Sequence, residues 1–373
     1  MDRRRLGDEL LALLGDLVAI PSTYPPGDTT RIADFCGSFL KEYRTEIVGK
    51  GNLVARIGGG SPSIVFNAHA DTVGVGERAA WRSDPFKATL LDGRVYGLGA
   101  CNCKASMAVH LWLAREIAKA GRPLRGELVF TFVGDEENLG PNGMAHLRDA
   151  GAVKPDTLIV AAPTRNRIVC EERGVMWVQV TTRGKAAHAG APHTGESAIL
   201  RMHEVMSELQ RRFKPKTSKS GQQSTLSIGR IRGGENINVV PGRCVIELDR
   251  RLLPDEDLDS AFLALKALCE KAGASSVELL TGTPGFSAPE SGPGARAFAE
   301  AIREVTGKPA ERLNVVGASD ARYFARDGIE ILVTGPGDGA YSHMPNESVA
   351  LQEIVDAALI HLAAAERLLR HER

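Results

Sequence analysis

"SIVFNAHADT", residues 63–72, joins a short apolar run to a histidine and an aspartate. The run "SIVF" predicts a buried β-strand, and "NAHADT" predicts a loop beyond its carboxyl end. Ligands of an open α/β sheet bind beyond the carboxyl ends of its strands. This segment therefore predicts an α/β fold and also the edge of the sheet at which a site lies.

The same kind of junction recurs along the first part of the chain. Residues 127–133, "ELVFTFV", run into "GDEE", and residues 157–162, "TLIVAA", predict another strand. A helical pattern at residues 105–120 lies ahead of these two runs and ends at Gly121, a C-terminal cap. Strands that alternate with helices indicate a mixed, mostly parallel sheet covered by helices.

Residues 174–283 have a different order of elements. They predict helices at residues 196–213 and 256–272, and strands at "VMWVQVTT", "STLSIGR", "RCVIELD" and "SSVELL". This β-α-β-β-α-β order is that of a ferredoxin-like α+β domain. We expect it to be inserted into an α/β domain of residues 1–173 and 284–373. Its exposed sheet edges predict a homodimer formed through the inserted domain.

Composition narrows the class of partner. A chain of 373 residues exceeds the usual size of one core, which favours two domains. Lys plus Arg equals Asp plus Glu at 46 each, so no net field favours nucleic acid or an anionic membrane. No apolar run reaches the about 18 residues of a membrane span. A small-molecule substrate is the expected partner.

The cysteines and the N-terminal segment indicate a cytoplasmic protein. Six scattered cysteines in a chain that needs no disulfides predict free thiols in a reducing compartment. Asp8, Glu9 and Asp16 interrupt the apolar N-terminal segment, which favours an amphipathic helix over a signal peptide.

Polar side chains follow three of the predicted strands. His69 and Asp71 follow "SIVF", Glu136 and Glu137 follow "VFTFV", and His343 comes after "ILVTGPG". Singly, each signal is weak, because a loop histidine is usually solvated and paired glutamates usually form a surface face. Their coincidence at strand ends predicts a metal or acid/base site.

A set of motifs along nearly the whole chain carries a family resemblance. Their order and spacing are similar to those of the M20 family of metallopeptidases. The resemblance implies a catalytic domain interrupted by a ferredoxin-like lid and dimerisation domain, and cleavage of an amide bond by water that two zinc ions activate. The motifs are "HADTV", "WRSDPF", "DGRVYGLGACNCKAS", "GDEENLG", "APT", "GKAAHAGAPHTGESA", "GENINVVPG", "DRR", "GASDAR" and "SHMPNE".

The resemblance also implies roles for the residues at the strand ends. His69 would bind the first ion, and Asp71 would help to orient this site without binding the ion itself. Glu137 and His343 would bind the second ion. Glu136 would be the general base that takes the proton of the water.

Two family carboxylates are absent from this chain. Asn102, in "GACNCKAS", stands where the family has the aspartate that bridges both ions, and Ala162, in "AAPT", stands where it has an acidic ligand. Two divalent ions about 3.5–4 Å apart repel by roughly 20 kcal/mol at a dielectric of about 20. With Glu137 as the one remaining carboxylate ligand, we expect at most one zinc ion or none, with Asn102 able to lend a neutral oxygen.

Cys101 and Cys103 offer an alternative set of ligands. If the backbone at Asn102 is extended, the side chains on either side of it point away from it. Thiolate ligation therefore stays an alternative to small buried side chains.

The inserted domain and the loop after it supply further candidates by the resemblance. His188 would reach the active site of the neighbouring subunit and stabilise an oxyanion, although such a histidine can also be an ordinary turn residue. Asn238 and Arg251 would bind the substrate, the arginine by paired hydrogen bonds to a carboxylate. Gly317 would let the backbone approach a ligand.

By the resemblance, these residues imply a hydrolase of a small N-acyl amino acid or dipeptide-like amide, with Glu136 as general base and a depleted metal site. One alternative is metal-independent acid/base hydrolysis of an activated substrate by Glu136 and His188. Another is a non-catalytic binding protein. A substitution introduced at Asn102 or Ala162 to trap a substrate would give the same pattern.

Overall fold

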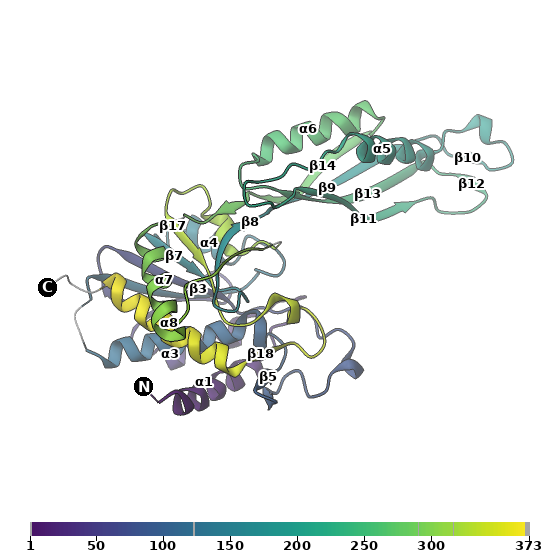
Figure 1. The fold of residues 1–373 in the computed structure, drawn as a ribbon. Coiled ribbons are helices and arrows are strands. Elements are labelled where there is room, and N and C mark those ends of the chain that lie inside the picture. Colours follow the sequence, from purple (N-terminus) through teal and green to yellow (C-terminus); the bar gives the residue numbers. More distant parts are fainter. Residues whose placement is uncertain (1, 122–123, 290, 316, 370–373) are drawn as a thin grey trace. The chain divides into compact units, whose positions relative to one another are not determined.

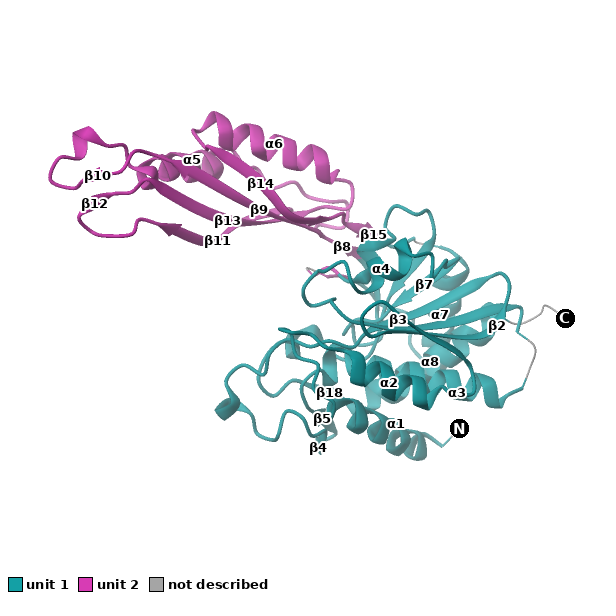
Figure 2. Ribbon diagram, turned by 180° about the vertical axis from the view of Figure 1, so that it is seen from behind, with its two compact units in different colours: residues 1–170, 288–313, 319–373 teal, residues 171–287, 314–318 magenta. Residues whose placement is uncertain are grey.

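The computed structural model describes residues 2–121, 124–289, 291–315 and 317–369. The chain divides into two compact units, which Figure 2 distinguishes by colour. Unit 1 comprises residues 1–170, 288–313 and 319–373, and unit 2 comprises residues 171–287 and 314–318. The second unit is therefore inserted into the first along the sequence.

Unit 1 is built on a six-stranded mixed sheet of order β1-β2-β6-β3-β7-β17 (Figure 1). The four strands β6, β3, β7 and β17 pair in parallel, while β1 and β2 are antiparallel. Strands β3 and β7 are buried along their whole length, as expected for parallel strands covered on both faces. The strands are β1 (Arg44–Val48), β2 (Asn52–Gly59), β3 (Ser63–His69), β6 (Gly126–Val133), β7 (Thr157–Val160) and β17 (Glu330–Val333).

Helices α1, α3, α7 and α8 pack against one another in unit 1. Helix α1 buries Leu6, Leu10, Leu13, Leu14 and Leu17, as expected of the predicted amphipathic helix, and α3 is buried on nearly all sides. The helices are α1 (Arg3–Val18), α2 (Thr30–Phe39), α3 (Ala105–Lys119), α4 (Met144–Asp149), α7 (Pro293–Thr306) and α8 (Leu351–Leu369). The expected α/β fold is confirmed.

Unit 2 contains the predicted β-α-β-β-α-β order. Its antiparallel sheet has the order β11-β13-β9-β14, with α5 and α6 on one face. Burial alternates along β13, because one face of the sheet packs on these helices. The elements are β9 (Gly174–Arg183), α5 (Ala198–Arg212), β11 (Thr225–Gly233), β13 (Arg243–Leu252), α6 (Leu258–Lys271) and β14 (Ser276–Thr283).

Short strands complete both units. In unit 1, β18 and β4 each pair with β5, and in unit 2, β10 pairs with β12. Strand β8 pairs with β15 and belongs to a three-stranded sheet with β16. These strands are β4 (Thr89–Leu91), β5 (Arg94–Tyr96), β8 (Ile168–Glu172), β10 (Ala187–His188), β12 (Val239–Val240), β15 (Phe286–Ser287), β16 (Arg312–Val315) and β18 (Ser348–Ala350).

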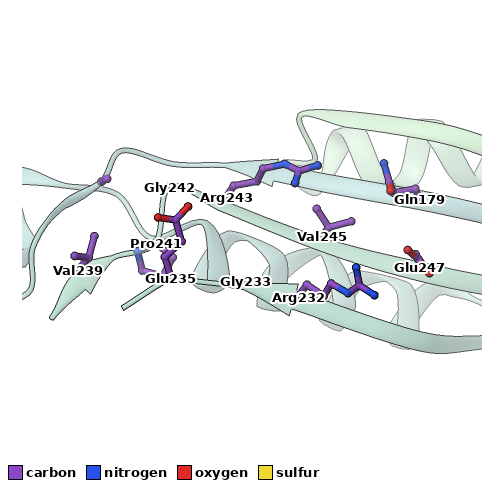
Figure 3. Close-up of a pocket in the computed structure, with 12 residues that line it drawn as sticks. Gln179, Arg232, Gly233, Glu235, Val239, Pro241, Gly242, Arg243, Val245 and Glu247 are labelled. Carbon is purple, nitrogen blue, oxygen red and sulfur yellow. The ribbon is translucent and has the colours of Figure 1, made fainter. Parts of the chain in front are cut away.

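A pocket of about 390 Å³ lies on unit 2 beside β11, β13 and the segment before β12 (Figure 3). Arg232 and Arg243 line it together with Glu235 and Glu247, so its charges are balanced. None of the predicted site residues is among those that line it.

Two further predictions can be compared with the described residues. All six cysteines carry free thiols, as expected. Among the helices of the described segments, we find none with the length and apolar character that crossing a bilayer requires.

Two histidines are buried in the core of unit 1. The rings of His110 and His361 lie with centroids 5.4 Å apart, against Phe66 and Phe298. Neither ring nitrogen of His110 has a hydrogen-bond partner among the described residues. Burial lowers the pKa of His361 to about 3 and holds the pKa of His110 well below its ordinary value. Both rings are therefore neutral in the folded protein at neutral pH.

Because His110 and His361 are buried as neutral rings, we expect the protein to lose stability in mild acid. The unfolded chain takes up a proton at each histidine below a pH of about 6.5, whereas the folded chain does not, so unfolding becomes easier as the pH falls from there towards 3. The slope is up to about 1.4 kcal/mol per pH unit for each histidine. Urea unfolding at pH 7 and pH 5.5 measures the free energy of unfolding at each pH. Its decrease on acidification should be smaller for His110→Leu than for the native protein. The exposed-site control His203→Leu should keep the native slope, and equal slopes in all three proteins would contradict the assignment.

Candidate active site

The pairing of β3 with β6 sets the position of the site. His69 is the last residue of β3 and lies opposite Val133, the last residue of the parallel strand β6. The loops that carry Asp71 and Glu136 therefore start at the same edge of the sheet. This is the edge at which the sequence predicted a site.

His69 is buried and contacts several polar groups. Its Nδ1 lies 3.0 Å from the main-chain oxygen of Asp71 and 3.5 Å from Asp71 Oδ1. Its Nε2 lies 3.2 Å from Asn102 Oδ1 and 4.0 Å from Glu136 Oε2. Burial alone would lower the pKa of His69, but Cys103 and the neighbouring carboxylates raise it well above its ordinary value.

The amide of Asn102 lies at the centre of the predicted metal residues. Its Oδ1 faces His69, and its Nδ2 lies 3.1 Å from Glu137 Oε1 and 3.1 Å from His343 Nε2. Glu137 Oε1 and His343 Nε2 are 2.9 Å apart, and this hydrogen bond raises the pKa of His343 against the effect of burial. One side chain thus contacts all three of the other residues predicted to bind metal.

The carboxylate of Glu347 fixes the backbone around Asn102. It accepts hydrogen bonds from the main-chain N–H groups of Gly99, Cys101 and Asn102, at 2.9, 3.0 and 2.8 Å. Burial raises the pKa of Glu347 to about 7, and the three N–H groups oppose that rise. Lys104 Nζ donates to the carbonyl of Ile20 at 2.8 Å; burial lowers the pKa of Lys104 to about 7, and the charge of Glu347 opposes that fall. Glu347 ends the motif "SHMPNE", but we did not predict this anchoring role.

The two cysteines lie differently: Cys103 is close enough to act on the pKa of His69, whereas Cys101 binds elsewhere. The backbone is extended at Asn102, with φ −127° and ψ 94°, but not at Cys103, with φ −135° and ψ 17°, so the side chains do not simply alternate. The Cys101 thiol donates to the carbonyl of Asp338 at 3.4 Å, and burial raises its pKa to about 12. Among the described residues, the histidine, cysteine and carboxylate groups with metal-compatible spacing are His69, Glu136 and Glu137.

An arginine that the sequence analysis did not single out binds Glu136. Arg322 Nη1 donates to Glu136 Oε1 at 3.0 Å, and its side chain is 1% exposed. Its Nη2 donates to Tyr323 Oη at 3.0 Å, and that hydroxyl donates to the carbonyl of Gly140 at 2.7 Å. Residues 322 and 323 therefore fix both ends of loop 136–140. Burial raises the pKa of Glu136 to about 7, although His69 and Arg322 lower it.

A second buried carboxylate lies beside this arginine. Asp320 Oδ1 is 3.8 Å from Arg322 Nη2, and Asp320 Oδ2 accepts from Asn67 Nδ2 at 2.8 Å. Asn67 in turn accepts from the hydroxyl of Thr131 at 2.8 Å. The motif "GASDAR" contains both charged residues, but nothing in the sequence indicates that they would be buried against Glu136.

His188 and Asn238 lie together in unit 2. His188 belongs to β10 and pairs with Val239 of β12, while the carbonyl of Asn238 accepts from the N–H of Ala189 at 2.9 Å. The His188 ring is exposed, and its Nδ1 accepts from the N–H of Gly190 at 3.0 Å. The role predicted for His188 is in the active site of a neighbouring subunit, and that predicted for Asn238 is substrate binding. Both stay predictions.

Arg251 and Gly317 also belong to unit 2. The guanidinium of Arg251 binds Asp249 through two hydrogen bonds of 2.8 and 3.0 Å, and Asp249 also accepts from Trp177 Nε1 at 2.8 Å. This pairing orients the arginine and leaves its Nη1 group for another acceptor. The six predicted residues of unit 1 form one cluster, whereas the four of unit 2 remain separate predictions.

The fold and the unit 1 cluster define a class of protein, namely a hydrolase of C–N amide bonds with a metallopeptidase architecture. The profile of peptidase family M20/M25/M40 matches residues 65–367, and the chain belongs to this family. Enzymes of the family are metal-dependent. The M20 resemblance inferred from the motifs is therefore confirmed.

Curated relatives cover nearly the whole chain. The succinyl-diaminopimelate desuccinylase of Bordetella petrii is 30% identical over 96% of this chain and 98% of its own. That of Rhodospirillum centenum is 28% identical over 96% of each chain. Coverage of this extent means that both units have counterparts in these relatives.

Solved structures share the fold. An M20 family metallo-carboxypeptidase from Sulfolobus solfataricus superposes with a TM-score of 0.82 at 17% identity, covering 97% of this chain and 99% of its own. A dinuclear metal-binding M20 peptidase of Bacillus subtilis gives 0.73 at 16% identity, covering 97% and 98%. At these identities the superpositions show the fold alone.

The Arg322 contacts predict a large stability effect. Arg322→Met leaves Glu136 and Asp320 buried without their cation, which should lower the free energy of unfolding by about 3–5 kcal/mol. The loss should be smaller at pH 5.5 than at pH 8, because a proton can then neutralise a carboxylate. Guanidinium chloride unfolding followed by tryptophan fluorescence measures both values.

A matched control is available on the surface. Arg148 binds Asp327 through two hydrogen bonds, but its side chain is 39% exposed. Arg148→Met should therefore lower the free energy of unfolding by only about 0–1 kcal/mol. A similar loss in the two variants would refute the special role of the buried pair.

Proposed function

We propose that the chain hydrolyses the amide bond of a small N-acylated amino acid or dipeptide-like compound, with Glu136 as the general base. One observation carries this proposal. Arg322 holds Oε1 of Glu136, while Oε2 faces His69 at 4.0 Å in the cluster of predicted metal residues. A base held by one oxygen presents the other in a fixed direction, which general base catalysis requires.

We further propose a depleted zinc site with at most one ion. Two ions do not fit the donor set, because Ala162 has no donor side chain and the amide nitrogen of Asn102 faces Glu137 and His343. A neutral amide cannot offset the repulsion of two divalent ions as a bridging carboxylate does. A single ion fits better and, when bound, would polarise the scissile carbonyl and lower the pKa of water from 15.7 to about 7.

The substrate class follows from the relatives and from unit 2. The two desuccinylases support an N-acyl amino acid that carries a carboxylate. Arg251, which Asp249 orients, and Asn238 are the proposed substrate-binding residues, and Gly317 would let the backbone approach the substrate. His188 is proposed to stabilise the oxyanion in the active site of a second subunit, so the proposal includes a homodimer formed through unit 2. Asp71, which accepts from the N–H of Glu137 at 3.0 Å, would hold the loop of the base.

Turnover of a defined panel tests the proposed reaction. Protein purified without chelators is incubated with N-succinyl and N-acetyl amino acids and with dipeptides, and the released amine is measured. Glu136→Gln should lower kcat on the order of 10²–10⁴-fold, because general base catalysis is lost. The exposed substitution Glu278→Gln, in unit 2, should leave kcat unchanged.

The same assay distinguishes the alternatives. Undiminished turnover in the presence of chelator would replace the zinc proposal with a metal-independent hydrolase. Saturable ligand binding without turnover would indicate a non-catalytic binding protein. Full activity of Glu136→Gln would exclude this residue as the base.

Restoring the family carboxylates tests the depleted site. The double variant Asn102→Asp with Ala162→Glu should raise the zinc content towards two ions per chain, because both carboxylates absent from the family pattern return. Each single variant should stay nearer one ion. Elemental analysis after dialysis measures the stoichiometry, and an unchanged content in the double variant would count against the placement of these residues.

A further inference from the structure

The open face of the unit 2 sheet carries two arginines close to the end of β11. Arg232 of β11 pairs with Val245 of β13, and Arg243 lies two residues before Val245 on β13. Cys244 and Ile246, the neighbours of Val245 on β13, are buried in the core that the sheet forms with α5 and α6. Because side chains alternate along a strand, Arg232, Arg243 and Val245 lie on the opposite, open face.

Both arginines line the pocket of about 390 Å³ on this face. Figure 3 shows the side chains of Arg232 and Arg243 on either side of Val245. Their positions are diagonal neighbours on paired strands, about 7–8 Å apart, which is within reach of long side chains. Pockets that bind small molecules have volumes from about 300 Å³ upwards, so one small ligand fits between the two guanidinium groups.

The four charged residues that line the pocket balance only formally. The carboxylate of Glu247 binds Arg230 at 3.1 Å, and Arg230 does not line the pocket. Arg232, Arg243 and Glu235 have no ion-pair partner among the described residues. The charged groups of the pocket that remain unpaired are therefore two guanidinium groups and one carboxylate.

A further arginine adds to the positive charge at Arg243. Arg183 of β9 lies directly opposite Arg243 in the pairing of β9 with β13. Like charges directly opposite each other on neighbouring strands are destabilising. A carboxylate bound at Arg243 would offset part of this repulsion.

The segment that follows β11 forms another wall of the pocket. Gly234 has a φ of 80°, which L side chains rarely adopt, and it turns the chain out of β11. Glu235 comes directly after this turn, and Pro241 and Gly242 lead back into β13. Glu235 thus lines the same space as the two arginines.

We propose that this pocket binds an acidic amino acid. Its two carboxylates pair with Arg232 and Arg243, and its ammonium group pairs with Glu235. Such a ligand carries the charges that complement the three unpaired groups, and guanidinium groups bind carboxylates through paired hydrogen bonds. The site includes none of the residues assigned to the proposed reaction, so it does not depend on that reaction.

Three ligands that differ by one charged group test this assignment. Isothermal titration of the full-length, metal-stripped chain should show saturable binding of L-glutamate. Glutarate lacks the ammonium group, and L-glutamine lacks the second carboxylate. Each should bind about tenfold more weakly than L-glutamate, because each loses one charged contact.

Variants of the pocket assign the contacts to residues. Arg232→Gln and Arg243→Gln should each weaken the binding of L-glutamate about tenfold. Glu235→Gln should weaken the binding of L-glutamate but not that of glutarate, which has no ammonium group. The control Arg211→Gln, at an exposed position of α5, should bind L-glutamate as the native chain does.

The other outcomes are decisive against the proposal. Absence of saturable L-glutamate binding, or native affinity in both Arg232→Gln and Arg243→Gln, would overturn it. Equal affinities for glutarate and L-glutamate would exclude the contact with Glu235. Loss of binding in Arg251→Gln, with native affinity in Arg232→Gln, would place the ligand at the proposed substrate residues instead. The expected binding pattern in a chain that hydrolyses no amide would uphold this site and refute only the proposed reaction.

Discussion

The parallel pairing of β3 with β6 is the constraint on which the candidate site depends. It places His69 opposite Val133, so that the loops of Asp71 and Glu136 leave the sheet side by side. A shift of one residue would turn the His69 side chain to the opposite face of the sheet. The apolar side chains of β3 and β6, which are buried along nearly their whole length, oppose such a shift. The geometry of the site is therefore set by packing that lies outside it.

Hydrogen bonding explains how an asparagine is accommodated at the centre of this cluster. In the described structure, the single amide of Asn102 contacts His69, Glu137 and His343 at hydrogen-bond distances. An amide can both donate and accept, whereas a carboxylate can only accept. The same side chain can thus satisfy its neighbours with or without a cation. A carboxylate at this position would leave the centre dependent on metal for its charge balance.

The sequence predicted the fold and the position of the site because both depend on local patterns. Apolar runs predicted the parallel strands, and polar residues directly after them predicted the active edge. The buried partners Arg322 and Glu347 were not predicted, since charged residues are mostly exposed and their burial depends on contacts far along the chain. Glu347 is separated from Asn102 by 245 residues, and Arg322 from Glu136 by 186. No periodicity or spacing signals contacts of this kind.

The buried carboxylates Glu136 and Glu347 indicate whether the site still has a function. A buried, unpaired ion is costly, so a centre without function would be expected to lose its carboxylates or expose them. Here Glu136 keeps Arg322 and Glu347 keeps three main-chain N–H donors. Both acids thus have protein partners that lower the cost of burying them. Such partnering is expected of buried acids that keep a role in the folded protein, as the proposed reaction requires of Glu136.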